Sequence, residues 1–210
     1  QYANEEDTSE KLDAKGKTLV QAIVGSFLYY GRALETPTLV ALNDIGMQQA
    51  SPTKNTVKET EWLMDFLAHH PNAKIRFFAG NMQLAVDSDA SYLVAPGAKS
   101  RYAGHFYLES SPHPKNYNKA PHNAAIHTEC KILRNVVCSA AEAECGGLFH
   151  NAQMATRIRR VLEAIGHPQK ATRIKTDNKT ANSFVHASMR VKISKTWDMR
   201  YHWLREQTTR

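Results

Sequence analysis

The chain has 210 residues, of which 42% are hydrophobic, and this length suits one large domain or two small ones. It contains no run of about 18 apolar residues, so no membrane-spanning helix is expected. Its polar, acidic start lacks the pattern of a signal peptide. The formal net charge is +7, and residues 170–210 carry this whole excess, with ten Lys or Arg against three Asp or Glu. Such asymmetry favours a polyanionic partner such as nucleic acid, and the alternative is a solvated basic face.

The first third of the chain is predicted to be helical. After a loose leader over residues 1–16, apolar side chains recur at helical spacing in three stretches, 17–35, 36–50 and 56–70. Thr36, which Pro37 follows, is the predicted N-cap of the second helix. Thr56, with Glu59 three residues later, has the capping-box pattern at the start of the third helix. Pro71 is expected to end this helical segment.

After Pro71 the pattern becomes that of an α/β fold. Residues 73–79 and 82–89 are predicted strands, joined by a hairpin turn at Gly80-Asn81. Ser139 is the predicted N-cap of one long helix that ends near Gly166. The remaining predicted elements are strands at 101–108, 126–137 and 171–178, a long loop at 109–125, and helices at 178–187 and 195–206. We therefore predict a helical subdomain over residues 1–72 and an α/β domain over residues 73–210.

Three acidic residues have positions typical of a site in an α/β domain. Asp89 ends one predicted strand, Asp177 ends another, and Glu144 lies in the first two turns of the long helix. Functional groups of an α/β sheet gather at strand ends and at the start of the next helix. Carboxylates held close together repel one another and raise one another's pKa unless a cation lies between them. Carboxylate oxygens favour Mg²⁺ or Mn²⁺, and paired ions of this kind serve phosphoryl transfer.

The alternative is that these acids have no common site. A strand-end Asp is most often a solvated surface group. Glu142 and Glu144 could instead be first-turn acids that complement the dipole of the helix. The sequence pattern by itself leaves both interpretations open.

Four short motifs resemble one known family. "SDASY" (88–92), "SAAEAE" (139–144), "TDN" (176–178) and "SKTWDMRYHWLRE" (194–206) are similar to the ribonuclease H region of copia-type LTR-retrotransposon Pol polyproteins. Residues 24–53 resemble the segment upstream of that region, the thumb and connection part of reverse transcriptase. The motifs occur in the family's order over nearly the whole chain, and this ordered set is more specific than any one motif.

The resemblance implies a ribonuclease H-like mixed sheet flanked by helices, and cleavage of the RNA strand of RNA–DNA hybrids with two Mg²⁺ or Mn²⁺ ions. It carries the catalytic and metal-binding roles to Asp89, Glu144 and Asp177, with Glu142 as the alternative for the glutamate. Asp87 would tune the local field, and Asn178 would help to position substrate. The basic residues expected to bind nucleic acid are Lys175, Lys179, Arg190, Lys192 and Lys195, and His186 is a candidate proton shuttle.

The chain also departs from the family. No polymerase palm with paired Asp is present, and the family continues past residues 194–206 into a strand and a helix that carries a fourth carboxylate. We therefore expect a C-terminally truncated domain, and we take Asp198 to be structural rather than the fourth acid. The expected partner is the remainder of the Pol polyprotein, and the expected location is a cytoplasmic virus-like particle or the nucleus. The alternative function is that of a catalytically silent, nucleic-acid-binding or structural fragment.

Overall fold

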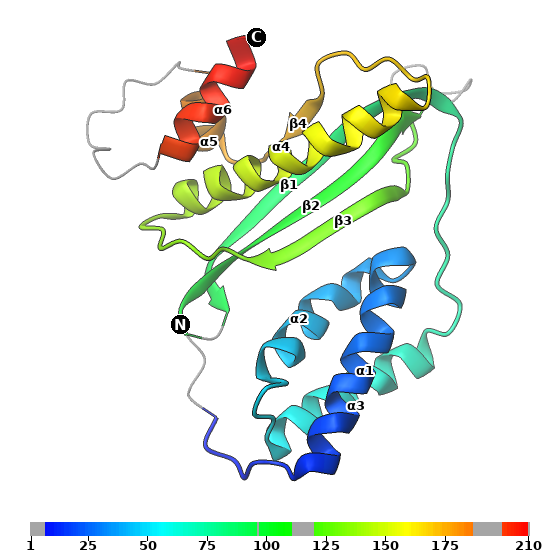
Figure 1. The fold of residues 1–210 in the computed structure, drawn as a ribbon, viewed down its shortest axis with the longest axis vertical. Coiled ribbons are helices and arrows are strands. Elements are labelled where there is room, and N and C mark those ends of the chain that lie inside the picture. The colour runs from blue at the N-terminus through cyan, green and yellow to red at the C-terminus, as the bar shows by residue number, and fades with distance from the viewer. Residues whose placement is uncertain (1–6, 96, 111–119, 187–198, 210) are drawn as a thin grey trace. The chain divides into compact units, whose positions relative to one another are not determined.

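The computed structural model describes residues 7–95, 97–110, 120–186 and 199–209 (Figure 1). The chain divides into two compact units. One comprises Gln1–Ile75 with Ala95–Gly97, and the other comprises Arg76–Val94 with Ala98–Arg210. The predicted boundary between residues 72 and 73 lies close to this division. The assignment of the two units to segments of reverse transcriptase stays a prediction.

The described part of the first unit is helical. Its elements are α1 (Ala14–Ala33), the short 3-10 helix η1 (Thr36–Thr38), α2 (Leu39–Gln48) and α3 (Lys54–His69). One apolar side from each α-helix meets in a common core, which contains Val20, Val24, Leu42, Ile45, Leu63 and Leu67. Burial of a large apolar side chain contributes about 1.5–3 kcal/mol, so this shared core holds the three helices together.

The ends of these helices differ from the prediction. Helix α1 begins at Ala14, because Asp13 caps it and accepts a hydrogen bond from Gly16 N. Thr36 does not cap α2, since it opens the separate turn η1. The N-cap of α3 is Thr53 instead of Thr56, and Thr56 provides the second half of the capping box.

The second unit contains a four-stranded mixed sheet, which confirms the predicted α/β class. Its strands are β1 (Gly80–Ala95), β2 (Lys99–Ser110), β3 (Ala125–Ile132) and β4 (Arg173–Lys175). The spatial order is β3-β2-β1-β4, with β2 and β3 antiparallel and β1 and β4 parallel. In the β1–β4 register, Ala85 lies opposite Arg173 and Asp87 lies opposite Lys175. The sheet is compatible with a ribonuclease H-like fold.

The long helix α4 (Ala140–Ala164) packs against this sheet, and α5 (Lys179–Val185) and α6 (Met199–Thr209) pack near its first half (Figure 1). Leu84 and Val86 of β1 and Phe106 of β2 share a core cluster with Ala155 and Leu162 of α4. A second cluster joins α4 to α5 and α6 through Cys145, Leu148, Phe149, Ala181, Phe184, Tyr201 and Leu204. Ser139 caps α4, as predicted, by accepting a hydrogen bond from Glu142 N.

The predicted hairpin at Gly80-Asn81 is wrong. No strand forms over residues 73–79, and β1 begins at Gly80. Residues just before β1 bind the segment before β3 instead, because Phe78 N donates to Asn123 Oδ1 over 2.9 Å. Gly80 is needed for a close approach of backbones, since a Cβ there would lie 1.8 Å from the carbonyl oxygen of Glu109. Two other strands are shorter than predicted, β3 ending at Ile132 and β4 spanning only Arg173–Lys175.

Candidate metal centre

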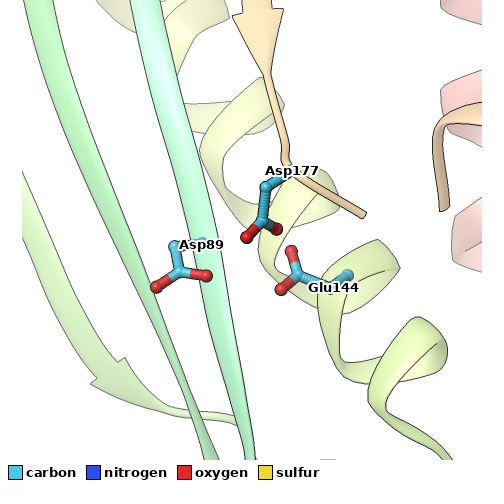
Figure 2. Close-up of side chains that lie close together, drawn as sticks. All are labelled: Asp89, Glu144 and Asp177. Carbon is cyan, nitrogen blue, oxygen red and sulfur yellow. The ribbon is translucent and has the colours of Figure 1, made fainter. Parts of the chain in front are cut away.

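The three predicted carboxylates converge in the second unit. Asp89 comes from β1, Glu144 from the second turn of α4, and Asp177 from the segment between β4 and α5 (Figure 2). One carboxylate oxygen from each residue lies within 4.8 Å of the other two. Asp89 and Asp177 are exposed, whereas Glu144 is only 4% exposed. The cluster is therefore open to solvent on the aspartate side and closed on the glutamate side.

Glu144 can contact the backbone of β1 because β4 is short. The β1–β4 ladder ends at the pair of Asp87 and Lys175, so the edge of β1 beyond that point is not paired with β4. There the backbone N–H of Ala90 donates to Glu144 Oε1 over 3.1 Å. Thr176, directly after β4, donates from its hydroxyl to Glu144 Oε2 over 3.2 Å. Both oxygens of this buried carboxylate thus have a hydrogen-bond donor from a neighbouring segment.

Burial is the main cause of an altered proton affinity at Glu144. It raises the pKa of this carboxyl, and the negative charges of Asp89 and Asp177 raise it further. The hydrogen bonds from Ala90 and Thr176 act in the opposite direction because they favour the charged form. The net effect raises the pKa of Glu144 to about 7, from an ordinary value of 4.5.

This arrangement could hold a metal ion. Three carboxylates within 4.8 Å repel one another, and a divalent cation between them would remove that repulsion. All the donor atoms are carboxylate oxygens, which suit hard cations, whereas zinc is usually bound through His and Cys. The residues present therefore fit a hard divalent cation such as Mg²⁺ or Mn²⁺.

Glu142, the alternative glutamate, forms hydrogen bonds at the start of α4 instead of joining the cluster. It is 4% exposed, and its Oε2 accepts a hydrogen bond from Cys138 N over 2.7 Å. Its own N–H donates to Ser139 Oγ, which caps α4. Glu142 thus holds the backbone at the start of α4, and Glu144 is the glutamate that lies with Asp89 and Asp177.

Asp87 is not a member of the cluster. Its carboxylate lies 2.9 Å from His122 Nε2 and 3.8 Å from Lys175 Nζ, and it accepts a weak hydrogen bond from the Tyr107 hydroxyl. The ring of His122 packs at 4.8 Å from the rings of both Tyr107 and His105. Asp87 therefore belongs to a separate group of polar and aromatic side chains, which no sequence pattern predicts.

The other predicted residues have mixed outcomes. Asn178 is the N-cap of α5, and its side chain accepts from Ala181 N, so it is committed to the helix start. Lys179 is the exposed first residue of α5, and Lys175 pairs with Asp87. His186 follows α5 and, with Thr176, lines a cavity of about 330 Å³. The other predicted residues, Arg190, Lys192, Lys195 and Asp198, lie outside the described residues.

Comparison of the chain with protein-family models, with curated proteins and with solved structures finds no match. None of the helices in the described part of the chain is long and apolar enough to cross a membrane.

Proposed function

We propose that this chain hydrolyses the RNA strand of RNA–DNA hybrids with the help of divalent cations. The observation that carries the proposal is the convergence of Asp89, Glu144 and Asp177 from three separate segments. The same three residues, in the same order, are the ones to which the ribonuclease H motif resemblance assigns the chemistry. The motifs and the geometry of the cluster thus support the same three residues.

The three acids would hold two Mg²⁺ or Mn²⁺ ions, which supply Lewis-acid chemistry for phosphodiester hydrolysis when bound. Asp89 and Asp177 are exposed, so they face the side from which a nucleic acid can approach. Glu144 is fixed from behind by Ala90 and Thr176. The products would be a 3′ hydroxyl and a 5′ phosphate.

The charge of the second unit supports a nucleic-acid substrate. Residues 76–210 contain 20 Lys or Arg and 10 Asp or Glu, whereas residues 1–75 contain 7 and 10. The formal charge is therefore +10 in the unit that carries the cluster and −3 in the other. Lys175 and Lys179 flank Asp177 in the chain and would bind the phosphate backbone beside the cluster. The remainder of the Pol polyprotein as partner, and the virus-like particle or nucleus as location, follow from the resemblance alone.

The test is cleavage of an end-labelled RNA–DNA hybrid by the whole chain with Mg²⁺ or Mn²⁺. Asp89→Asn keeps the size of the side chain but removes its charge, so we expect cleavage to be lost while the folded state is retained. Asp65→Asn, an exposed change on α3, is the matched control and should cleave like the wild type. Cleavage that persists in Asp89→Asn would show that the cluster is not the catalytic centre.

The same charge distribution favours a second candidate function. An excess of ten positive charges binds nucleic acid whether or not a cation occupies the cluster. A catalytically silent binding fragment would bind the hybrid in a strongly salt-dependent way and would not cleave it with either metal. The cleavage assay, run beside a binding assay, separates the two functions.

A further inference from the structure

The hydroxyl of Thr176 takes part in two hydrogen bonds. It donates to Glu144 Oε2 over 3.2 Å, and it accepts from the backbone N–H of Asn178 over 3.2 Å. A threonine hydroxyl has a single hydrogen, so the bond to the carboxylate uses its only donor. Thr176 therefore connects the buried glutamate of α4 to the segment that carries Asp177.

That segment is itself fixed at its far end. Asn178 caps α5, because its side chain accepts from Ala181 N over 2.9 Å. Asp177 thus lies between two residues whose polar groups are already committed, Thr176 on one side and Asn178 on the other. The chain of bonds runs from the start of α5 through Asn178 and Thr176 to Glu144, and it sets the relative placement of two of the three carboxylates.

We propose that Thr176 is a positioning residue, which holds Glu144 and Asp177 in the arrangement that binds a divalent cation. This inference rests on the proposed function, because it takes the cluster to be a metal site. Groups that orient metal-binding side chains commonly change metal affinity by about 10- to 100-fold when they are removed. Without this hydroxyl, the donor to the Glu144 carboxylate that remains among the described residues is Ala90 N, and the carboxylate could turn away from the cluster.

The experiment measures Mn²⁺ binding directly, by the loss of the free-ion electron paramagnetic resonance signal, with no nucleic acid present. Thr176→Val removes the hydroxyl and keeps the branched shape of the side chain. We expect its Mn²⁺ affinity to fall by about tenfold. Thr176→Ser keeps the hydroxyl and should bind like the wild type. Thr180→Val makes the same change at an exposed position on α5 and should also leave affinity unchanged.

Thermal unfolding of each variant in EDTA separates positioning from a general loss of structure. If Thr176 only supports the fold, Thr176→Val unfolds at a lower temperature but binds Mn²⁺ like the wild type, and the inference is overturned. Equal loss of affinity in Thr176→Ser and Thr176→Val would also overturn it, because the hydroxyl would not matter. If the wild type binds no Mn²⁺, the cluster is not a metal site and the inference fails. The same holds if the Asp89→Asn variant binds Mn²⁺ with the affinity of the wild type.

Discussion

Glu144 differs from the two aspartates because it is buried and they are exposed. A buried carboxylate with a raised pKa lowers the stability of the folded protein wherever it must be charged. Glu144 therefore makes the metal-free protein less stable at neutral and alkaline pH, and a bound cation would reverse this effect. The buried carboxylate in the cluster thus lowers the free energy of unfolding of the metal-free protein, and cation binding would raise it again.

This property predicts a pH dependence. Between about pH 4.5 and pH 7 the folded state holds a proton on Glu144 that the unfolded state has released, so stability falls as pH rises through this window. Glu144→Gln removes the titration, and at pH 8 in EDTA it should raise the free energy of unfolding by up to about 3 kcal/mol. Urea unfolding at pH 4 and pH 8 measures this.

The effect of Glu144→Gln should be small at pH 4, where the wild-type carboxyl is protonated in the folded state. Glu163→Gln, at a half-exposed position on α4 whose carboxylate lies 3.6 Å from Arg159, is the control and should change stability little at either pH. An effect of Glu144→Gln that is equal at both pH values would contradict burial as the origin.

At the level of elements, the contact of α4 with β2 requires Gly104. A Cβ added there would lie 2.3 Å from Asn151 Oδ1. Asn151 is completely buried and donates to Ser88 Oγ and to the carbonyl of Ala103, both over 2.9 Å, so it cannot move aside freely. These hydrogen bonds hold the middle of α4 over β1 and β2. They thereby also fix the position of Glu144 relative to Ala90.

Gly104→Ala is therefore expected to destabilise the protein by about 1–3 kcal/mol in urea unfolding, because it overpacks this contact. Gly25→Ala on α1 is the control, since a Cβ there meets nothing within 4 Å, and it should be neutral or stabilising. The double variant Gly104→Ala with Asn151→Ala should lose less than the sum of its two single changes. Strict additivity would show that the two residues do not clash.

The long helix was predictable because its signals are local. Ser139 caps α4 as predicted, Glu144 lies near the start of that helix, and Asp177 follows the end of β4. The prediction that Asp89 ends its strand was wrong, because β1 continues past it to Ala95. The helix starts predicted at Thr36 and Thr56 were wrong. Several neighbouring threonines could each cap a helix, and local sequence does not determine which of them does so. Gly80 was misassigned to a turn, since the carbonyl of Glu109 that approaches it is remote in the sequence.

The supporting contacts of the site were not predictable. The role of Thr176 depends on a glutamate 32 positions away in the chain, and a hydroxyl beside an aspartate has no special meaning by itself. The pairing of Asp87 with His122 spans 35 positions and involves a long loop, for which the sequence offers no spacing rule. Sequence patterns thus identified the charged groups, and the structure was needed to show what holds them.

Across the whole molecule, charge is divided between the two units. The unit with the cluster has a formal charge of +10 and the helical unit has −3, so nucleic acid should bind chiefly to the former. The affinity for the hybrid should therefore fall steeply as salt concentration rises, because phosphate contacts release counterions.

Lys175→Ala and Lys179→Ala are each expected to weaken binding of the hybrid and to reduce the slope of log affinity against log salt by about one. Fluorescence anisotropy with a labelled hybrid in EDTA measures this without cleavage. Lys15→Ala, an exposed change on α1, should leave both affinity and slope unchanged. A slope that responds equally to all three changes would argue against a preferred binding unit.

The parallel pairing of β1 with β4 has a kinetic consequence. Asp89 and Asp177 are brought together only when residues 85–87 pair with residues 173–175. The chain between these two segments includes β2, β3 and the long helix α4, which packs against the sheet. Contacts between such distant segments form late in folding, because the loop between them must first be closed. A cation bound at this junction would therefore slow unfolding far more than it speeds folding, and it would extend the lifetime of the folded protein.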